Sequence, residues 1–232
     1  MRAFALRRQL LGGAFVVLGG AALACNDTTA TDVPVPVAAV LTENSGVEAQ
    51  SATVGTALPA PISVKLTESG QPTGGRVVSW KVESGGGSID AATSTTDANG
   101  DAVVHWTLGT VAGPDTLIAT TADSATSIIT ATAIAGPAAA LKEVSGDAQD
   151  IAAGATPAPL VVKVVDQYGN VVPGATIAWS VTGGAAIDNT STITDAGGLA
   201  QVTLTSIAAP GTFTVTASAA GVAPVMFTER EE

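Results

Sequence analysis

Apolar and polar residues alternate along most of the chain after residue 36, in short runs. In residues 62–67, the even-numbered positions hold Ile, Val and Leu, and the positions between them hold Ser, Lys and Thr. Successive side chains of a strand point to opposite faces, so this period of two predicts strands with one buried face. Residues 102–108 and 213–217 have the same pattern. We therefore predict many short strands and an all-β fold.

The residues between these runs are typical of turns. "DANGD" at 97–101 and "DQYGN" at 166–170 combine Asp, Asn and Gly, which favour tight turns. Ala, Val, Thr and Gly are abundant, whereas aromatic residues make up only 3% of the chain. Short strands of small side chains with frequent turns indicate antiparallel sheets that pack face to face.

The second half of the chain repeats the first. "TTDANGDAVVHWTL" aligns with "ITDAGGLAQVTLTS", and their Asp97 and Asp195 are 98 residues apart. This period is close to the roughly 100 residues of one immunoglobulin-type sandwich. We predict two tandem immunoglobulin-like β-sandwich domains, at residues 37–135 and 136–232.

The first 36 residues have a different composition. Three arginines precede an uncharged apolar run at 10–23, and its 14 residues are fewer than the roughly 17–25 of a membrane-spanning helix. A basic start, a short apolar centre and a small-residue end predict an export signal peptide at 1–24. The Thr-, Asp- and Pro-rich residues 25–36 are predicted to be a flexible tether.

The only cysteine, Cys25, follows this predicted signal. "AALAC" resembles the lipobox of bacterial lipoproteins, in which the cysteine thiol is acylated and becomes the new amino terminus. The resemblance implies export and a lipid on Cys25 that anchors the chain to a bacterial membrane, at the outer membrane or the cell surface. The alternative is a secreted protein whose first mature residue is a cysteine. "RRQLL" resembles a twin-arginine signal, so both general and twin-arginine export remain open.

The repeated segments also resemble a known family. "VVDQYGNVVPGATIAWSV", followed by "TDAGGLAQVTLTS" and "PGTFTVTA", resembles the group 1 bacterial immunoglobulin-like (Ig-like) domain of invasin and intimin. The first half resembles it through "TTDANGDAVVHWTLGTVAG", but its "ESGQPTGG" lacks the Asp and Asn of the corresponding turn. The resemblance implies surface-exposed spacer or adhesion modules that carry no catalytic residues.

Charge and candidate chemistry exclude several function classes. The net charge is −11, which argues against binding nucleic acid through a basic face. The single histidine, His105, lies on the outward side of its predicted strand, where the second half has Thr203. The Asp and Glu residues are expected in turns and on outward faces, and no G-x-S-x-G motif is present. We predict a protein that is not an enzyme and needs no cofactor.

One turn has the spacing of a calcium loop. Asp97, Asn99 and Asp101 stand at positions 1, 3 and 5 of an EF-hand-type loop, but position 12 is Leu108 rather than glutamate. The second half keeps only the first of these three residues. "NG" is itself a strong hairpin signal. We favour a turn held by local hydrogen bonds over a calcium site.

The tryptophans allow two interpretations. Trp80, Trp106 and Trp179 could stack on sugars, but all three fall on the inward side of their strands, so we predict core residues. Tyr168 is then the one aromatic expected at the surface. The leading function is a spacer or adhesion module. The alternative is a binding module that holds an envelope glycan, a polymer or a protein through its loops or sheet edges.

Overall fold

Every regular element in the described part of the chain is a β-strand. The computed structural model describes residues 38–44, 49–207 and 210–232, and these residues contain no helix. Val37–Glu232 form one compact unit. The predicted all-β fold class is confirmed.

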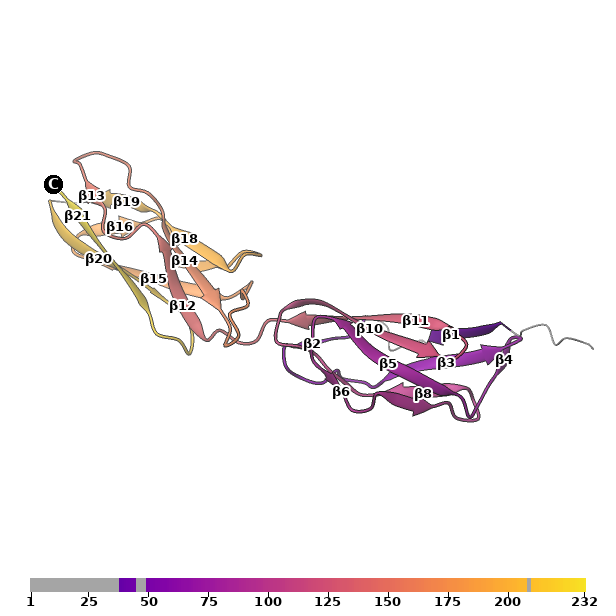
Figure 1. Ribbon diagram of the computed structural model, residues 1–232. Coiled ribbons are helices and arrows are strands. Elements are labelled where there is room, and N and C mark those ends of the chain that lie inside the picture. Colours follow the sequence, from indigo (N-terminus) through magenta and orange to yellow (C-terminus); the bar gives the residue numbers. More distant parts are fainter. Residues whose placement is uncertain (1–37, 45–48, 208–209) are drawn as a thin grey trace, which may run out of the picture. The chain divides into compact units, whose positions relative to one another are not determined.

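The first sandwich consists of the first eleven strands. These are β1 (Ala39–Glu43), β2 (Ser51–Thr53), β3 (Ile62–Glu68), β4 (Gln71–Pro72), β5 (Val77–Ser84), β6 (Ser88–Ile89), β7 (Thr93–Thr95), β8 (Asp101–Val104), β9 (Trp106–Thr107), β10 (Gly113–Thr121) and β11 (Thr126–Ile134). The larger sheet has the order β2-β11-β10-β5-β7. The smaller has the order β1-β3-β4, with β8 also paired to β3 (Figure 1), and a short ladder joins β6 to β9.

The two sheets of the first sandwich enclose one hydrophobic core. Buried side chains from both sheets belong to a single cluster. In β3, Ile62, Val64 and Leu66 are at most 1% exposed, whereas the residues between them are half-buried. Burial of each such side chain stabilises the fold by roughly 1.5–3 kcal/mol. Because a one-residue slip would turn all three toward solvent, the alternation also determines the strand register.

The second sandwich consists of the remaining ten strands. These are β12 (Ala140–Ser145), β13 (Asp150–Ile151), β14 (Leu160–Val165), β15 (Thr176–Thr182), β16 (Ala185–Ile187), β17 (Ser191–Ile193), β18 (Leu199–Val202), β19 (Leu204–Ile207), β20 (Gly211–Ser218) and β21 (Val225–Glu231). One sheet has the order β13-β21-β20-β15-β17 and the other the order β12-β14-β18, while β16 pairs with β19. The second sandwich has its own core cluster.

The two sandwiches repeat each other in strand register. Gly113 of β10 pairs with Ala133 of β11, and 98 residues later Gly211 of β20 pairs with Glu231 of β21. In each sandwich one short strand pairs in parallel: β2 with β11, and β13 with β21. Because β1 pairs within the smaller sheet, the chain crosses to the edge of the larger sheet before β2. The repeat in the sequence is thus a repeat of one architecture.

Candidate functional site

Cys25, the predicted lipid attachment residue, lies outside the described residues. So do the predicted signal peptide at 1–24 and the predicted tether at 25–36. In the part of the chain that the structure describes, no helix is long and apolar enough to cross a membrane. Lipid attachment at Cys25 stays a prediction from the sequence.

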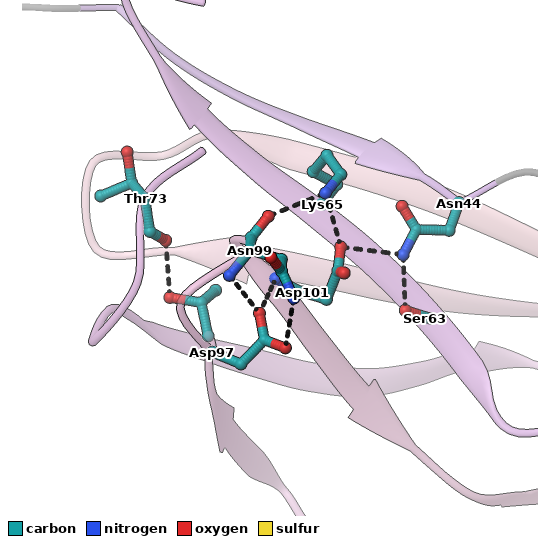
Figure 2. A network of polar contacts seen from close by, with 8 residues as sticks. Asn44, Ser63, Lys65, Thr73, Asp97, Asn99 and Asp101 are labelled. Carbon is teal, nitrogen blue, oxygen red and sulfur yellow. Dashed lines mark hydrogen bonds and ion pairs between the residues drawn. The ribbon is translucent and has the colours of Figure 1, made fainter. Parts of the chain in front are cut away.

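The Asp97 side chain organises the turn between β7 and β8. Its Oδ1 accepts hydrogen bonds from the backbone N–H groups of Asn99 (2.8 Å) and Asp101 (2.9 Å), as Figure 2 shows. The Gly100 N–H donates to the Asp97 carbonyl oxygen at 3.0 Å and closes the turn. Hydrogen bonds to the charged carboxylate, led by the one from the Asp101 backbone, hold the pKa of Asp97 below its ordinary value.

Asp101, the third candidate calcium ligand, faces a lysine. Its Oδ1 lies 3.1 Å from Lys65 Nζ and accepts a hydrogen bond of 3.1 Å from Asn44 Nδ2. Lys65 Nζ also donates to the Asn99 carbonyl oxygen at 2.8 Å (Figure 2). The Asp97 and Asp101 carboxylates thus contact different partners, and the Lys65 ammonium group lies beside the Asp101 carboxylate. Among the described residues, no group of three or more His, Cys, Asp or Glu side chains is placed to hold a metal ion.

The second sandwich builds the same turn without two of the three candidate ligands. Asp195 Oδ1 accepts from the N–H groups of Gly197 (2.8 Å) and Leu199 (2.9 Å). Gly198 has φ +70°, and its counterpart Gly100 has φ +79°, a region that favours glycine. The turn geometry therefore requires the Asp and the Gly but neither Asn99 nor Asp101. This supports the turn interpretation.

His105 is exposed and contacts one carboxylate. Its Nδ1 lies 2.8 Å from Asp90 Oδ2, and its backbone N–H donates to Asp90 Oδ1 at 2.9 Å. That backbone hydrogen bond is the main reason why the pKa of Asp90 is lowered. In the second sandwich the Thr203 N–H makes the same bond to Asp188 at 3.0 Å without a histidine. This backbone hydrogen bond to an aspartate therefore forms in both sandwiches, with or without a histidine side chain.

The three tryptophans are buried. Trp80, Trp106 and Trp179 are 4%, 1% and 3% exposed. Trp80 Nε1 donates to Ser94 and Trp179 Nε1 to Thr192, each at 2.8 Å, so the two sandwiches hold an equivalent indole in the same way. The structure leaves none of these rings available as an exposed stacking platform.

The expected placement of the acidic residues was wrong at two positions, Asp115 and Glu229, and right for Asp166, which lies in the predicted turn at 166–170 but is buried there. Asp115, Asp166 and Glu229 are at most 3% exposed. Asp115 and Glu229 have the same parity along their strands as the buried Leu117 and Phe227, which places them on the inward face. The alternation of inward and outward positions along each strand therefore predicts that Asp115 and Glu229 point inward. They were expected on outward faces because carboxylates usually remain in water.

The comparisons identify the family of the second sandwich. Residues 143–228 match the sequence model of the bacterial Ig-like domain, group 1. The predicted resemblance to this family is confirmed. No curated protein sequence matches the chain.

Solved structures share the fold. InvD of Yersinia pseudotuberculosis is 19% identical over 84% of this chain and 58% of that chain, with a TM-score of 0.52. The Escherichia coli adhesin FdeC is 18% identical over 82% of this chain and 63% of that chain, with a TM-score of 0.50. The chain covers less than two thirds of the length of either structure. At these identities the likeness concerns the fold alone.

Proposed function

We propose, from the premise that residues 143–228 form a group 1 bacterial Ig-like domain, that this chain is a non-catalytic protein of the bacterial cell envelope. Its two Ig-like domains, at residues 37–135 and 136–232, act as a spacer or adhesion-type module. The family match is the observation that carries the proposal. The polar groups support it, because Asp97 and His105 engage in backbone hydrogen bonds that recur in the second sandwich.

A lipid on Cys25 would anchor this module. The support is the sequence "AALAC", which places the only cysteine directly after the predicted signal peptide. Each buried CH₂ contributes only about 0.8 kcal/mol to membrane binding, so stable anchoring needs more than one acyl chain. The multiply acylated cysteine of bacterial lipoproteins meets this need, and the tether at 25–36 then separates the lipid from the first domain.

Cys25→Ser tests the anchor. We expect the wild-type chain to incorporate labelled fatty acid and to fractionate with membranes, and the variant to do neither, because serine lacks the thiol that carries the lipid. Ala30→Ser is the matched control, since it adds a serine to the tether and leaves Cys25 intact. Unchanged labelling and fractionation of Cys25→Ser would contradict a lipoprotein but would leave the Ig-like module in place.

A binding module is the second candidate function. The observation that favours it is a pair of exposed apolar residues at equivalent places, Ile128 in β11 (65% exposed) and Met226 in β21 (64% exposed). Removing exposed apolar surface from water favours association. A pull-down from envelope extracts with the chain and with Ile128→Thr/Met226→Thr tests it. An envelope glycan, polymer or protein that the wild type retains and the variant loses would favour binding over spacing.

A further inference from the structure

One asparagine of the second sandwich binds the backbone of the first. Asn170 Oδ1 accepts a hydrogen bond from the Ala112 N–H at 2.9 Å, and Asn170 Nδ2 donates to the Thr110 carbonyl oxygen at 2.8 Å. Both partners lie in the loop between β9 and β10. A single side-chain amide thus pairs with a donor and an acceptor of the same loop, which requires a defined orientation of that amide.

A buried carboxylate orients this asparagine. Asp166 Oδ1 accepts from the N–H groups of Tyr168 and Asn170, each at 2.9 Å. Its Oδ2 accepts from Asn170 Nδ2 and from the N–H of Gly136, again at 2.9 Å. Gly136 lies in the segment between β11 and β12. One carboxylate therefore ties the turn at 166–170 both to Asn170 and to the connecting segment.

The electrostatics of Asp166 agree with this role. Burial by itself raises the pKa of Asp166, but the hydrogen bonds from Asn170, Gly136 and Tyr168 together outweigh burial and lower the pKa. The carboxylate is thus charged near neutral pH. Hydrogen bonds to a charged acceptor are stronger than those between neutral groups.

The Tyr168 side chain also lies close to Gly55 of the first sandwich. Its hydroxyl oxygen lies 3.1 Å from the point that a Cβ on Gly55 would occupy. Gly55 follows β2 in the first sandwich and has φ +72°, so a larger residue would be strained there and would also meet the ring. Tyr168 is 48% exposed, and its Cζ and Cε2 atoms lie 3.6 and 3.7 Å from the same point.

We infer that the turn formed by Asp166, Tyr168 and Asn170 is a docking surface for the β9–β10 loop of a preceding Ig-like domain. It couples the two sandwiches energetically through the Asn170 amide and the Asp166 carboxylate. The partner it fits is a main chain that presents a free N–H and a free carbonyl oxygen two residues apart, as Ala112 and Thr110 do. This inference does not depend on the proposed envelope function.

Among its described residues, the first sandwich has no turn equivalent to 166–170. At the corresponding place, β3 and β4 are joined by a two-residue hairpin, with Glu68 paired to Gln71. Glu68 forms an ion pair with Arg76 at 3.0 Å instead of organising a turn. No aromatic residue stands between Glu68 and Gln71. The missing Asp and Asn of "ESGQPTGG" thus correspond to a missing docking function.

The second sandwich has no backbone N–H donor at the position that corresponds to Ala112. The residue 98 positions after Ala112 is Pro210, and proline has no backbone N–H. Pro210 therefore could not donate to a turn like 166–170 the hydrogen bond that the Ala112 N–H donates to Asn170. In the described residues, the turn at 166–170 pairs with the β9–β10 loop across one junction. The junction is specific for the order of these two sandwiches.

A double-mutant cycle on the full chain tests the coupling. Asn170→Ala removes the amide, and Ala112→Pro copies the residue of the second sandwich and removes the donor. Two changes in contact are non-additive, whereas distant independent changes add. We expect each single change to lower the melting temperature and the double variant to lose clearly less than the sum of the two. Additive losses would overturn the inference.

Hydrogen exchange provides a local measurement that does not depend on global stability. In the full chain we expect Asn170→Ala to speed exchange of the Ala112 N–H at least tenfold, while Asn99→Ala, an asparagine-to-alanine change in another turn, leaves it unchanged. The Trp179 N–H, which donates to the Thr190 carbonyl within the second sandwich, should keep its protection and so report an intact fold. Equal exchange at Ala112 in the wild type and in Asn170→Ala would overturn the inference.

Discussion

Asp115 and Glu229 occupy the same cross-strand pair of the two sandwiches, but on opposite strands. Asp115 of β10 pairs with Ala131 of β11. In the second sandwich Phe213 of β20, 98 positions after Asp115, pairs with Glu229 of β21. Each pair thus combines one acid with one apolar residue, and each sandwich buries a carboxyl group at this cross-strand pair.

Glu229 should make the second sandwich less stable as the pH rises. Burial raises the pKa of Glu229, and the negative charges of Asp147 and Glu143 raise it further, against a hydrogen bond from the Gln149 N–H. At pH values between the pKa of Glu229 in the unfolded chain and its raised pKa in the folded chain, the folded state binds more protons than the unfolded state. The free energy of unfolding is therefore highest below the ordinary pKa and falls as the pH rises through the folded pKa.

The variant Glu229→Gln removes this titration. We expect the melting temperature of the wild type to fall relative to that of the variant as the pH rises above about 4, the ordinary pKa of glutamate. Circular dichroism melts at a series of pH values provide the measurement. A difference between the two proteins that stays constant over this range would contradict the prediction.

Asp115→Asn should remove the same kind of pH dependence from the stability of the first sandwich. Burial raises the pKa of Asp115 against a long hydrogen bond of 3.4 Å from the Gly109 N–H, so the sign is the same: stability is lost as the pH rises. Asp150→Asn, the same change at an exposed position of β13, is the control. If both variants changed the pH dependence of melting equally, burial of Asp115 would not be the cause.

Trp179→Ala should destabilise the protein by about 3–5 kcal/mol, the range for deleting a large buried aromatic side chain. The indole is 3% exposed, packs beside Phe227 with 6.3 Å between ring centroids, and donates to Thr192. His105→Ala should change stability by no more than about 0.5 kcal/mol, because the side chain is exposed. Urea unfolding of both variants makes the comparison, and equal effects would refute the strand parity assigned to these residues.

A calcium chelator should leave the melting of the chain unchanged. The Asp97 carboxylate binds backbone N–H groups, and the Asp101 carboxylate pairs with Lys65, so the turn is held without an ion. Asp97→Ala should lower the melting temperature of the first sandwich, whereas Asp101→Asn should have little effect.

The opposite result would establish a cation site. A ligand present at 100 times its dissociation constant adds about 2.7 kcal/mol to stability, which a melting experiment detects. A chelator-induced drop confined to the first sandwich and absent in Asp97→Asn would make the turn at 97–101 a calcium site. The turn at 195–199, which has one carboxylate, is the internal control.

Strand parity and the repeat could be predicted from the sequence because both are local signals. The period of two marks the inward side of β3 at Ile62, Val64 and Leu66 whatever the strand pairs with. Repetition after 98 residues indicates one architecture used twice. The same parity pointed inward at Asp115 and Glu229, but the chemistry of the side chain was given more weight than its position. These two acids were thus within reach of the sequence, and were missed.

The sequence by itself determined the all-β fold, its repeat and the turn chemistry of "DANGD" and "DQYGN", because these depend on side-chain periodicity and on hydrogen bonds within a few residues. Only the tertiary structure decided that Asn170 reaches Thr110 and Ala112, about 60 positions earlier, and that Asp166 holds the segment at Gly136. A turn motif specifies the shape of its own backbone. Which distant donors and acceptors meet its outward polar groups depends on how whole sandwiches pack, and no local pattern encodes that.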